Sequence, residues 1–216
     1  CTTPQNIYIP RNGIMVGGER KSFDEVAVAI VGGVNWMLSD PARATEVLGA
    51  IQNDKTAKRI DQAVTEGGTV LRASEALKHP QFPRARVRTP LIVKCDARDE
   101  TLFMREMFGP ITYLIATDST EQSLELARRS AVEHGAITWS AYATGGDSIE
   151  RIEQAAADVG APLSINLTGQ IWVNQSAAFS DYHVTGCNPW GNATLTDAAF
   201  VANRFRVTQS SVPAAG

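Results

Sequence analysis

The chain has 216 residues, of which 44% are hydrophobic and 20% charged, a composition typical of a globular domain with a substantial apolar core. Its net charge of −3 and its short apolar stretches give no surface for nucleic acid and no membrane span, so we expect neither partner. Cys1, Cys95 and Cys187 are odd in number and widely spaced, which argues against a disulfide framework and a metal site and favours a reducing, cytoplasmic setting.

Apolar periodicity and turn residues predict alternating strands and helices. The clearest helix start is Ser22 followed by Glu25, a capping-box pattern that satisfies two amide groups at a helix end. We expect strands over residues 5–10, 69–72, 91–95, 111–117, 136–144, 162–166, 169–174 and 205–208, helices over residues 22–37, from residue 41, and over 55–66, 119–133 and 147–159, and a glycine-rich loop over 13–21.

The alternation of strands and helices in the second half of the chain implies right-handed crossovers between parallel strands. We therefore predict an α/β fold of three layers, in which a mostly parallel sheet is flanked by helices. Because ligands of such sheets sit beyond the carboxyl ends of the strands, we expect the functional site at that edge.

Cys1 is a candidate nucleophile, because a thiolate is the reactive form of cysteine. A free thiol has a pKa of about 8.5, so only a few per cent is ionised at neutral pH without help from its surroundings. The residues around Cys1 do not show such help, and an ordinary residue without a catalytic role explains Cys1 equally well.

A second candidate is the segment Glu106-Met107-Phe108-Gly109-Pro110, which stands just before a predicted strand. The carboxylate of Glu106 can accept two hydrogen bonds from a diol, the ring of Phe108 can cover a flat group, and Gly-Pro fixes the turn that follows. On residue chemistry alone, a plain turn with a solvated Glu106 and a core Phe108 is the simpler explanation.

Residues 179–186 are polar and aromatic with little periodicity, which is typical of a binding loop but also of any surface loop. Asp181 and His183 within it suggest acid/base chemistry, although a solvated pair is the simpler explanation. The position of His134 near the end of a predicted helix favours a contact with the helix dipole over a catalytic role. His79 is expected to lie in a loop.

Together these segments resemble the aldehyde dehydrogenase superfamily. In that family a Glu-x-Phe-Gly-Pro motif follows the nucleophilic cysteine at a spacing like the 105 positions from Cys1 to Glu106. A strand ending in Val-Asn comes later, as at Asn174, and then an aromatic loop of the type Phe-Gly-Gly-x-Lys-x-Ser-Gly, where residues 179–186 stand here. The departures from this loop indicate a divergent branch, and the opening Cys-Thr-Thr-Pro-Gln-Asn is similar to the phenylacetic-acid-degradation members, whose substrates are ring-cleavage semialdehydes.

The resemblance implies a catalytic domain over residues 1–204 and an oligomerisation strand with a flexible tail over residues 205–216. Cys1 would attack a small-molecule aldehyde, and NAD or NADP would be the cofactor. Glu106 would hold the nicotinamide ribose, Phe108 would pack near the nicotinamide ring, and Phe179 would line the substrate tunnel. In that family the main cofactor domain and the general base precede the cysteine, so we expect this chain alone to be inactive and the full-length protein to form a homo-oligomer.

Two other interpretations stay open. The first is an N-terminal-nucleophile hydrolase, in which the amino group of Cys1 is the base and the fold is a pair of stacked antiparallel sheets. The second is a non-catalytic oligomerisation module, in which residues 204–208 form an edge strand that pairs with another subunit.

Overall fold

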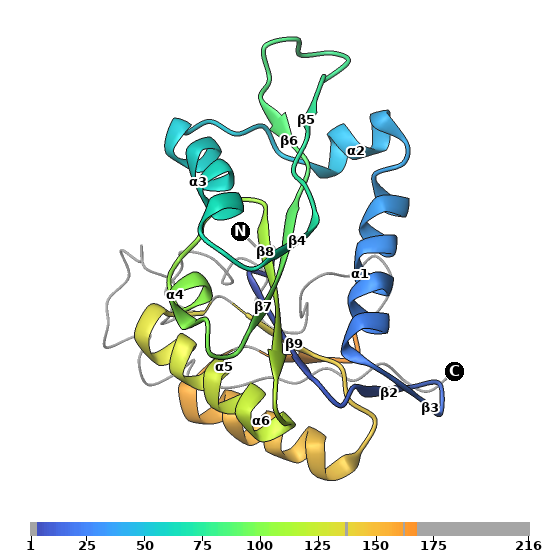
Figure 1. The fold of residues 1–216 in the computed structure, drawn as a ribbon, viewed down its shortest axis with the longest axis vertical. Helices are drawn as coiled ribbons and strands as arrows, with labels where there is room; N and C mark the ends of the chain where they lie inside the picture. Colours follow the sequence, from blue (N-terminus) through green and yellow to red (C-terminus); the bar gives the residue numbers. More distant parts are fainter. Residues whose placement is uncertain (1–3, 137, 162, 168–216) are drawn as a thin grey trace, which may run out of the picture. The chain divides into compact units, whose positions relative to one another are not determined.

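The computed structural model describes residues 4–136, 138–161 and 163–167 (Figure 1). The chain divides into two compact units, Thr3–Ser123 and Leu124–Gly216 with Cys1–Thr2. Within the described residues, no helix combines the length and the apolar character that crossing a membrane requires. The elements in chain order are β1 (Asn6–Pro10), β2 (Ile14–Val16), β3 (Glu19–Lys21), α1 (Phe23–Met37), α2 (Pro41–Val47), α3 (Asp54–Thr65), β4 (Thr69–Arg72), β5 (Ala76–Leu77), β6 (Val87–Arg88), β7 (Leu91–Asp96), α4 (Glu100–Phe103), β8 (Ile111–Thr117), α5 (Thr120–His134), β9 (Trp139–Ala141), α6 (Gly146–Val159) and β10 (Leu163–Ile165).

The main sheet of the first unit has four strands in the order β1-β8-β7-β4. β8 pairs in parallel with both β1 and β7, whereas the edge strand β4 runs antiparallel to β7. Every residue of β8 is buried, as expected for a central strand covered on both faces. The predicted α/β fold with a mostly parallel sheet is confirmed, and this pairing contradicts the stacked antiparallel sheets of the hydrolase interpretation.

Apolar side chains fix helices to the two faces of this sheet. On one face, α1 packs through Phe23 and Ala27 against Ile9, Ile92 and Leu114, all of them buried. Figure 1 shows α3 and α4 on the other side, where the rings of Tyr8 and Phe103 meet edge to face with centroids 6.1 Å apart. Each fully buried apolar side chain of this size stabilises the fold by roughly 1.5–3 kcal/mol.

The capping box predicted at the start of α1 is present. The Ser22 hydroxyl accepts from the Glu25 amide at 3.3 Å, and the Glu25 carboxylate accepts from the Ser22 amide at 2.8 Å. The Ser22 hydroxyl also donates to the Glu25 carboxylate at 2.8 Å, and these donations from the Ser22 amide and hydroxyl lower the pKa of Glu25. Asp40 begins α2 in a similar way, because its carboxylate accepts from the Arg43 amide at 2.8 Å.

Residues 13–21, expected as a loop, instead contain the antiparallel hairpin of β2 and β3. Gly17 and Gly18 connect the two strands with φ values of 59° and 83°. Two successive residues with positive φ form the tight hairpin turn that matches strand twist, so the glycines that suggested a loop are what permit the pairing. The short pair β5 and β6 and the single turn of α4 were not predicted either.

In the second unit, β9 and β10 pair in parallel, and buried side chains of α6 such as Ile152 and Ala156 pack against β10. β9 is shorter than the strand predicted over residues 136–144. At its carboxyl end the strand stops before Ala143, whose amide and carbonyl both bond the side chain of Asn166, at 2.9 and 2.8 Å, in place of a strand partner. The strands expected over residues 169–174 and 205–208 lie outside the described residues.

Gly13 and Gly18 offer a matched test of close packing, because both have a φ of 83°. A Cβ on Gly13 would lie 1.9 Å from the Lys21 carbonyl oxygen, whereas a Cβ on Gly18 meets nothing within 4 Å. Gly18→Ala should lower the free energy of unfolding by about 1 kcal/mol through backbone strain. Gly13→Ala should cost roughly 2 kcal/mol more, because the clash adds to the same strain. Urea denaturation measures both, and equal losses would contradict the close approach of Gly13 to β3.

Candidate functional site

The Glu106 loop, residues 104–110, joins α4 to β8, so it lies at the amino end of β8. Met107 is only 4% exposed and anchors the loop, while Glu106 and Phe108 on either side of it are exposed. Phe108, at 54% exposure, is therefore not the core residue of the plain-turn interpretation. The loop also departs from the expected carboxyl edge, because the motif precedes its strand along the chain.

Contacts with α3 hold the second half of this loop. Arg59 donates a hydrogen bond to the Phe108 carbonyl. Gly109 has a φ of 151°, and a Cβ there would lie 3.2 Å from the methyl group of Thr56. The Pro110 carbonyl then accepts from the Leu91 amide at 2.8 Å, which ties the loop to the start of β7. The turn after Phe108 is thus fixed by the backbone, by α3 and by β7.

Arg105 of this loop interacts with an acidic side chain, Glu66, and with the buried phenol of Tyr113. Arg105 forms an ion pair with Glu66, and Tyr113 of β8 is 1% exposed. Burial raises the pKa of the Tyr113 phenol against the opposing effect of the Arg105 guanidinium. The Tyr113 hydroxyl therefore stays protonated at neutral pH.

Gln5 is the residue of this site that the sequence did not indicate. Its side-chain nitrogen lies 2.8 Å from the Arg105 carbonyl oxygen and 3.2 Å from that of Phe103. Its side-chain oxygen accepts from the Met107 amide at 2.7 Å. The sequence offered only a polar side chain at the start of a predicted strand, and this does not reveal the partners that the half-buried side chain needs.

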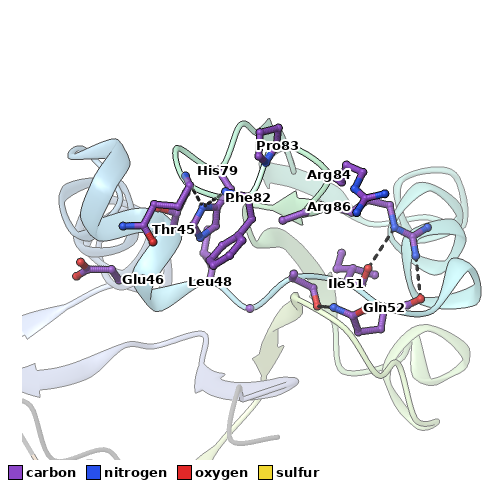
Figure 2. A pocket seen from close by; sticks show the side chains of 14 residues that line it. Thr45, Glu46, Leu48, Ile51, Gln52, His79, Phe82, Pro83, Arg84 and Arg86 are labelled. Atoms are coloured by element: carbon purple, nitrogen blue, oxygen red, sulfur yellow. Dashed lines mark hydrogen bonds between the residues drawn. The ribbon is translucent and has the colours of Figure 1, made fainter.

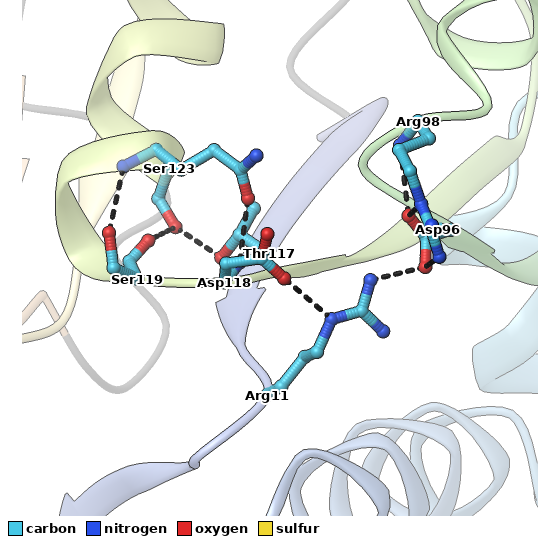
Figure 3. Close-up of polar contacts among 8 residues, drawn as sticks. Arg11, Asp96, Arg98, Thr117, Asp118, Ser119 and Ser123 are labelled. Carbon is cyan, nitrogen blue, oxygen red and sulfur yellow. Dashed lines mark hydrogen bonds and ion pairs between the residues drawn. The ribbon is translucent and has the colours of Figure 1, made fainter.

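A second polar cluster ties the carboxyl ends of the parallel strands together (Figure 3). Arg11, which follows β1, pairs with Asp96 at the end of β7 and, at 2.9 Å, with Asp118 after β8. Hydrogen bonds from the side chain and backbone of Arg98, and from Arg11, hold the pKa of Asp96 well below its usual range. The described residues bring together no group of three or more His, Cys, Asp or Glu that could hold a metal. We interpret this cluster as structural.

An open groove of about 850 Å³ runs between residues 45–52 and residues 79–86 (Figure 2). Arg86 bridges its two sides, donating to the carbonyls of Ile51 and Gln52 at 3.2 and 2.8 Å. His79 accepts from the amides of Gln81 and Phe82 at 3.1 and 3.2 Å, which confirms its place in a loop. Arg86 and His79, two of the polar side chains that line the groove, are thus already used to hold the segment in shape.

The structure also places the remaining candidate residues or leaves them outside the part that it describes. Burial raises the pKa of the Cys95 thiol to about 12, so this cysteine stays protonated and unreactive. His134 ends α5, as predicted. Glu106 and Phe108 are brought together on one loop, whereas Cys1, Phe179, Asp181 and His183 lie outside the described residues.

The mostly parallel sheet flanked by helices makes this an α/β protein, with the exposed Glu106 and Phe108 just before the central strand β8. Comparison with known proteins gives its family. Residues 20–191 match the aldehyde dehydrogenase family. This chain therefore belongs to the aldehyde dehydrogenase family.

Among solved structures, the chain is similar to an NAD-dependent aldehyde dehydrogenase from Burkholderia multivorans, with 57% identity and a TM-score of 0.82 over 95% of this chain and 37% of that one. An NAD-dependent benzaldehyde dehydrogenase from Corynebacterium glutamicum is 16% identical over 75% of this chain and 39% of that one, with a TM-score of 0.37 that is too low to carry an argument. None of the curated proteins matches the chain. The chain thus spans well under half the length of both solved relatives.

Asp96→Asn tests whether the cluster of Figure 3 stabilises the fold. Because the folded state lowers the pKa of Asp96, its stabilisation is fully present above the unfolded pKa of about 3.9 and is lost progressively as the pH falls from there through the lower folded pKa. We expect the variant to lose about 1 kcal/mol at pH 7, a value kept small because the Arg98 side of the cluster is exposed to solvent, and we expect its difference from the wild type to narrow as the pH falls towards 3.

Urea denaturation between pH 7 and pH 3 measures this difference. Asp61→Asn is the control, because Asp61 is exposed and makes a single ion pair, with Arg88 at 3.3 Å. A loss for Asp96→Asn that does not change with pH would contradict the ionic role of the cluster.

Proposed function

We propose that this chain is the nucleophile-bearing part of an NAD-dependent aldehyde dehydrogenase, an oxidoreductase that converts an aldehyde to an acid. The observation that carries the proposal is the Glu106 loop, on which an exposed carboxylate and an exposed aromatic ring stand on either side of a buried anchor. The 57% identity to the Burkholderia multivorans enzyme supports the activity and the choice of NAD.

In the proposed reaction, the Cys1 thiolate adds to the carbonyl carbon of the aldehyde and forms a thiohemiacetal. The backbone amide of Cys1 and a side-chain amide stabilise its oxyanion. NAD, when bound, supplies the hydride acceptor that turns this adduct into a thioester. Water then cleaves the thioester, which releases the acid and restores the thiol.

The chemistry of the Glu106 loop suits a dinucleotide. The exposed carboxylate of Glu106 can accept two hydrogen bonds from the vicinal hydroxyls of a ribose. The exposed ring of Phe108, two positions on, offers a flat apolar surface to an aromatic base. Gln5, whose side chain is hydrogen-bonded to the Glu106 loop, stands four positions after Cys1, so the covalent chain limits the separation of Gln5 and Cys1 to about 14 Å. The nucleophile and the cofactor loop can therefore serve one site.

For the substrate we propose a ring-cleavage semialdehyde, on the basis of the opening Cys-Thr-Thr-Pro-Gln-Asn. Phe179 would line the substrate tunnel. We further propose that the full-length protein acts in the cytoplasm as a homo-oligomer, in which residues 205–208 pair across subunits.

Cys1→Ser should lower the rate of NADH formation by the full-length protein at least about 10³-fold, because a serine hydroxyl is not ionised at neutral pH. The absorbance of NADH during aldehyde oxidation measures this rate. Cys95→Ala is the control, since Cys95 is a buried, protonated thiol. Comparable rates for Cys1→Ser and the wild type would remove Cys1 from the mechanism.

Glu106→Gln should raise the KM for NAD about 10-fold, because an amide accepts hydrogen bonds from the ribose less strongly than a carboxylate. The KM for the aldehyde should change little. Glu46→Gln, another exposed carboxylate of the same unit, serves as the matched control. An unchanged KM for NAD in Glu106→Gln would overturn the proposed role of the loop.

A further inference from the structure

We infer that Gln5 is a positioning residue, whose side-chain amide sets the backbone of Glu106 and thereby places the cofactor-binding pair. This inference rests on the proposed function of Glu106 and Phe108. It adds a residue that touches neither the substrate nor the cofactor and acts through the loop.

The hydrogen bonds of Gln5 fall on both sides of Glu106. The peptide before Glu106 is held at the Arg105 carbonyl, 2.8 Å from the Gln5 nitrogen, and the peptide after it is held at the Met107 amide, 2.7 Å from the Gln5 oxygen. The two backbone dihedrals of Glu106 lie between these two peptide planes. One side chain therefore restrains both, and with them the direction in which the carboxylate leaves the loop.

The backbone around Gln5 is itself held by hydrogen bonds to β8, so Gln5 can act as a fixed anchor for the loop. Its carbonyl accepts from the Tyr113 amide of β8 at 2.7 Å, and the preceding carbonyl, of Pro4, accepts from the Thr112 hydroxyl at 2.9 Å. Asn6 adds a hydrogen bond to the Phe103 carbonyl at 3.1 Å. The two side-chain hydrogen bonds of Gln5 to Arg105 and Met107, which we name the clamp, thus connect two loop peptides to the paired starts of β1 and β8.

Few side chains can replace Gln5 in this position. The clamp needs a donor and an acceptor on one planar group at the end of a two-methylene stem, which only glutamine and a protonated glutamate provide. The fold does not depend on it, because Met107 is buried and Arg59 separately holds the Phe108 carbonyl. Loss of these hydrogen bonds should therefore leave the direction of the Glu106 carboxylate less restrained without unfolding the unit.

The first test is Gln5→Met, which keeps the length of the side chain and removes its hydrogen bonds. We expect the KM for NAD of the full-length protein to rise about 10-fold, with a smaller change in the KM for the aldehyde. Amide hydrogen exchange should be faster at Met107, because its acceptor is gone. Gln62→Met, an exposed glutamine on α3, is the control.

The comparison with Glu106→Gln separates the two proposals. If Gln5→Met leaves the KM for NAD unchanged while Glu106→Gln raises it, the clamp is overturned and the proposed function stands. If Glu106→Gln also has no effect, the role of the loop in cofactor binding fails. Equal increases in both KM values of Gln5→Met would show general damage to the site and would overturn the positioning role.

Gln5→Glu gives a readout that general damage to the fold does not produce. The ionised carboxylate can accept from the Met107 amide but repels the carbonyls of Phe103 and Arg105, whereas the protonated acid regains one donor. The KM for NAD, taken relative to the wild type at each pH, should therefore fall as the pH is lowered. A ratio that stays constant with pH would overturn the clamp.

Discussion

The parallel pairing of β1 with β8 is the interaction on which the rest of the first unit depends. It joins residues about a hundred positions apart, with Asn6 opposite Tyr113 in the register. Closing so long a loop costs conformational entropy, and the complete burial of β8 between two helix-covered faces offsets it. Because the strands are parallel, their amino ends lie at one edge, which brings Gln5 beside the Glu106 loop.

The two edges of the sheet consequently differ in what they do. At the carboxyl edge, Arg11 pairs with both Asp96 and Asp118 and so ties three strands together. At the amino edge, Glu106 and Phe108 are exposed, while the backbone of the loop is held by hydrogen bonds at Arg105, Met107, Phe108 and Pro110. Rigid backbone under exposed side chains is the arrangement that binding a cofactor in a defined pose requires.

Local signals predicted the longer elements of the fold well. The capping box placed the start of α1, and the boundaries of β4 and β8 agree with the predicted strands. The elements that were missed are short, such as α4 and the pair β5 and β6, and too few residues repeat in them to show a period. β2 and β3 were hidden by Gly17 and Gly18, whose φ values select a hairpin that composition alone does not distinguish from a loop.

The sequence by itself determined the class of fold and the chemical identity of the Glu106 loop, because periodicity, caps and a five-residue motif are local properties of the chain. Only the tertiary structure decided that Met107 turns inward and that Glu106 and Phe108 turn outward. It also decided the partner of that loop. Gln5 meets Arg105 and Met107 only because β1 pairs with β8, and a hydrogen bond across so long a separation leaves no pattern in the residues on either side of it.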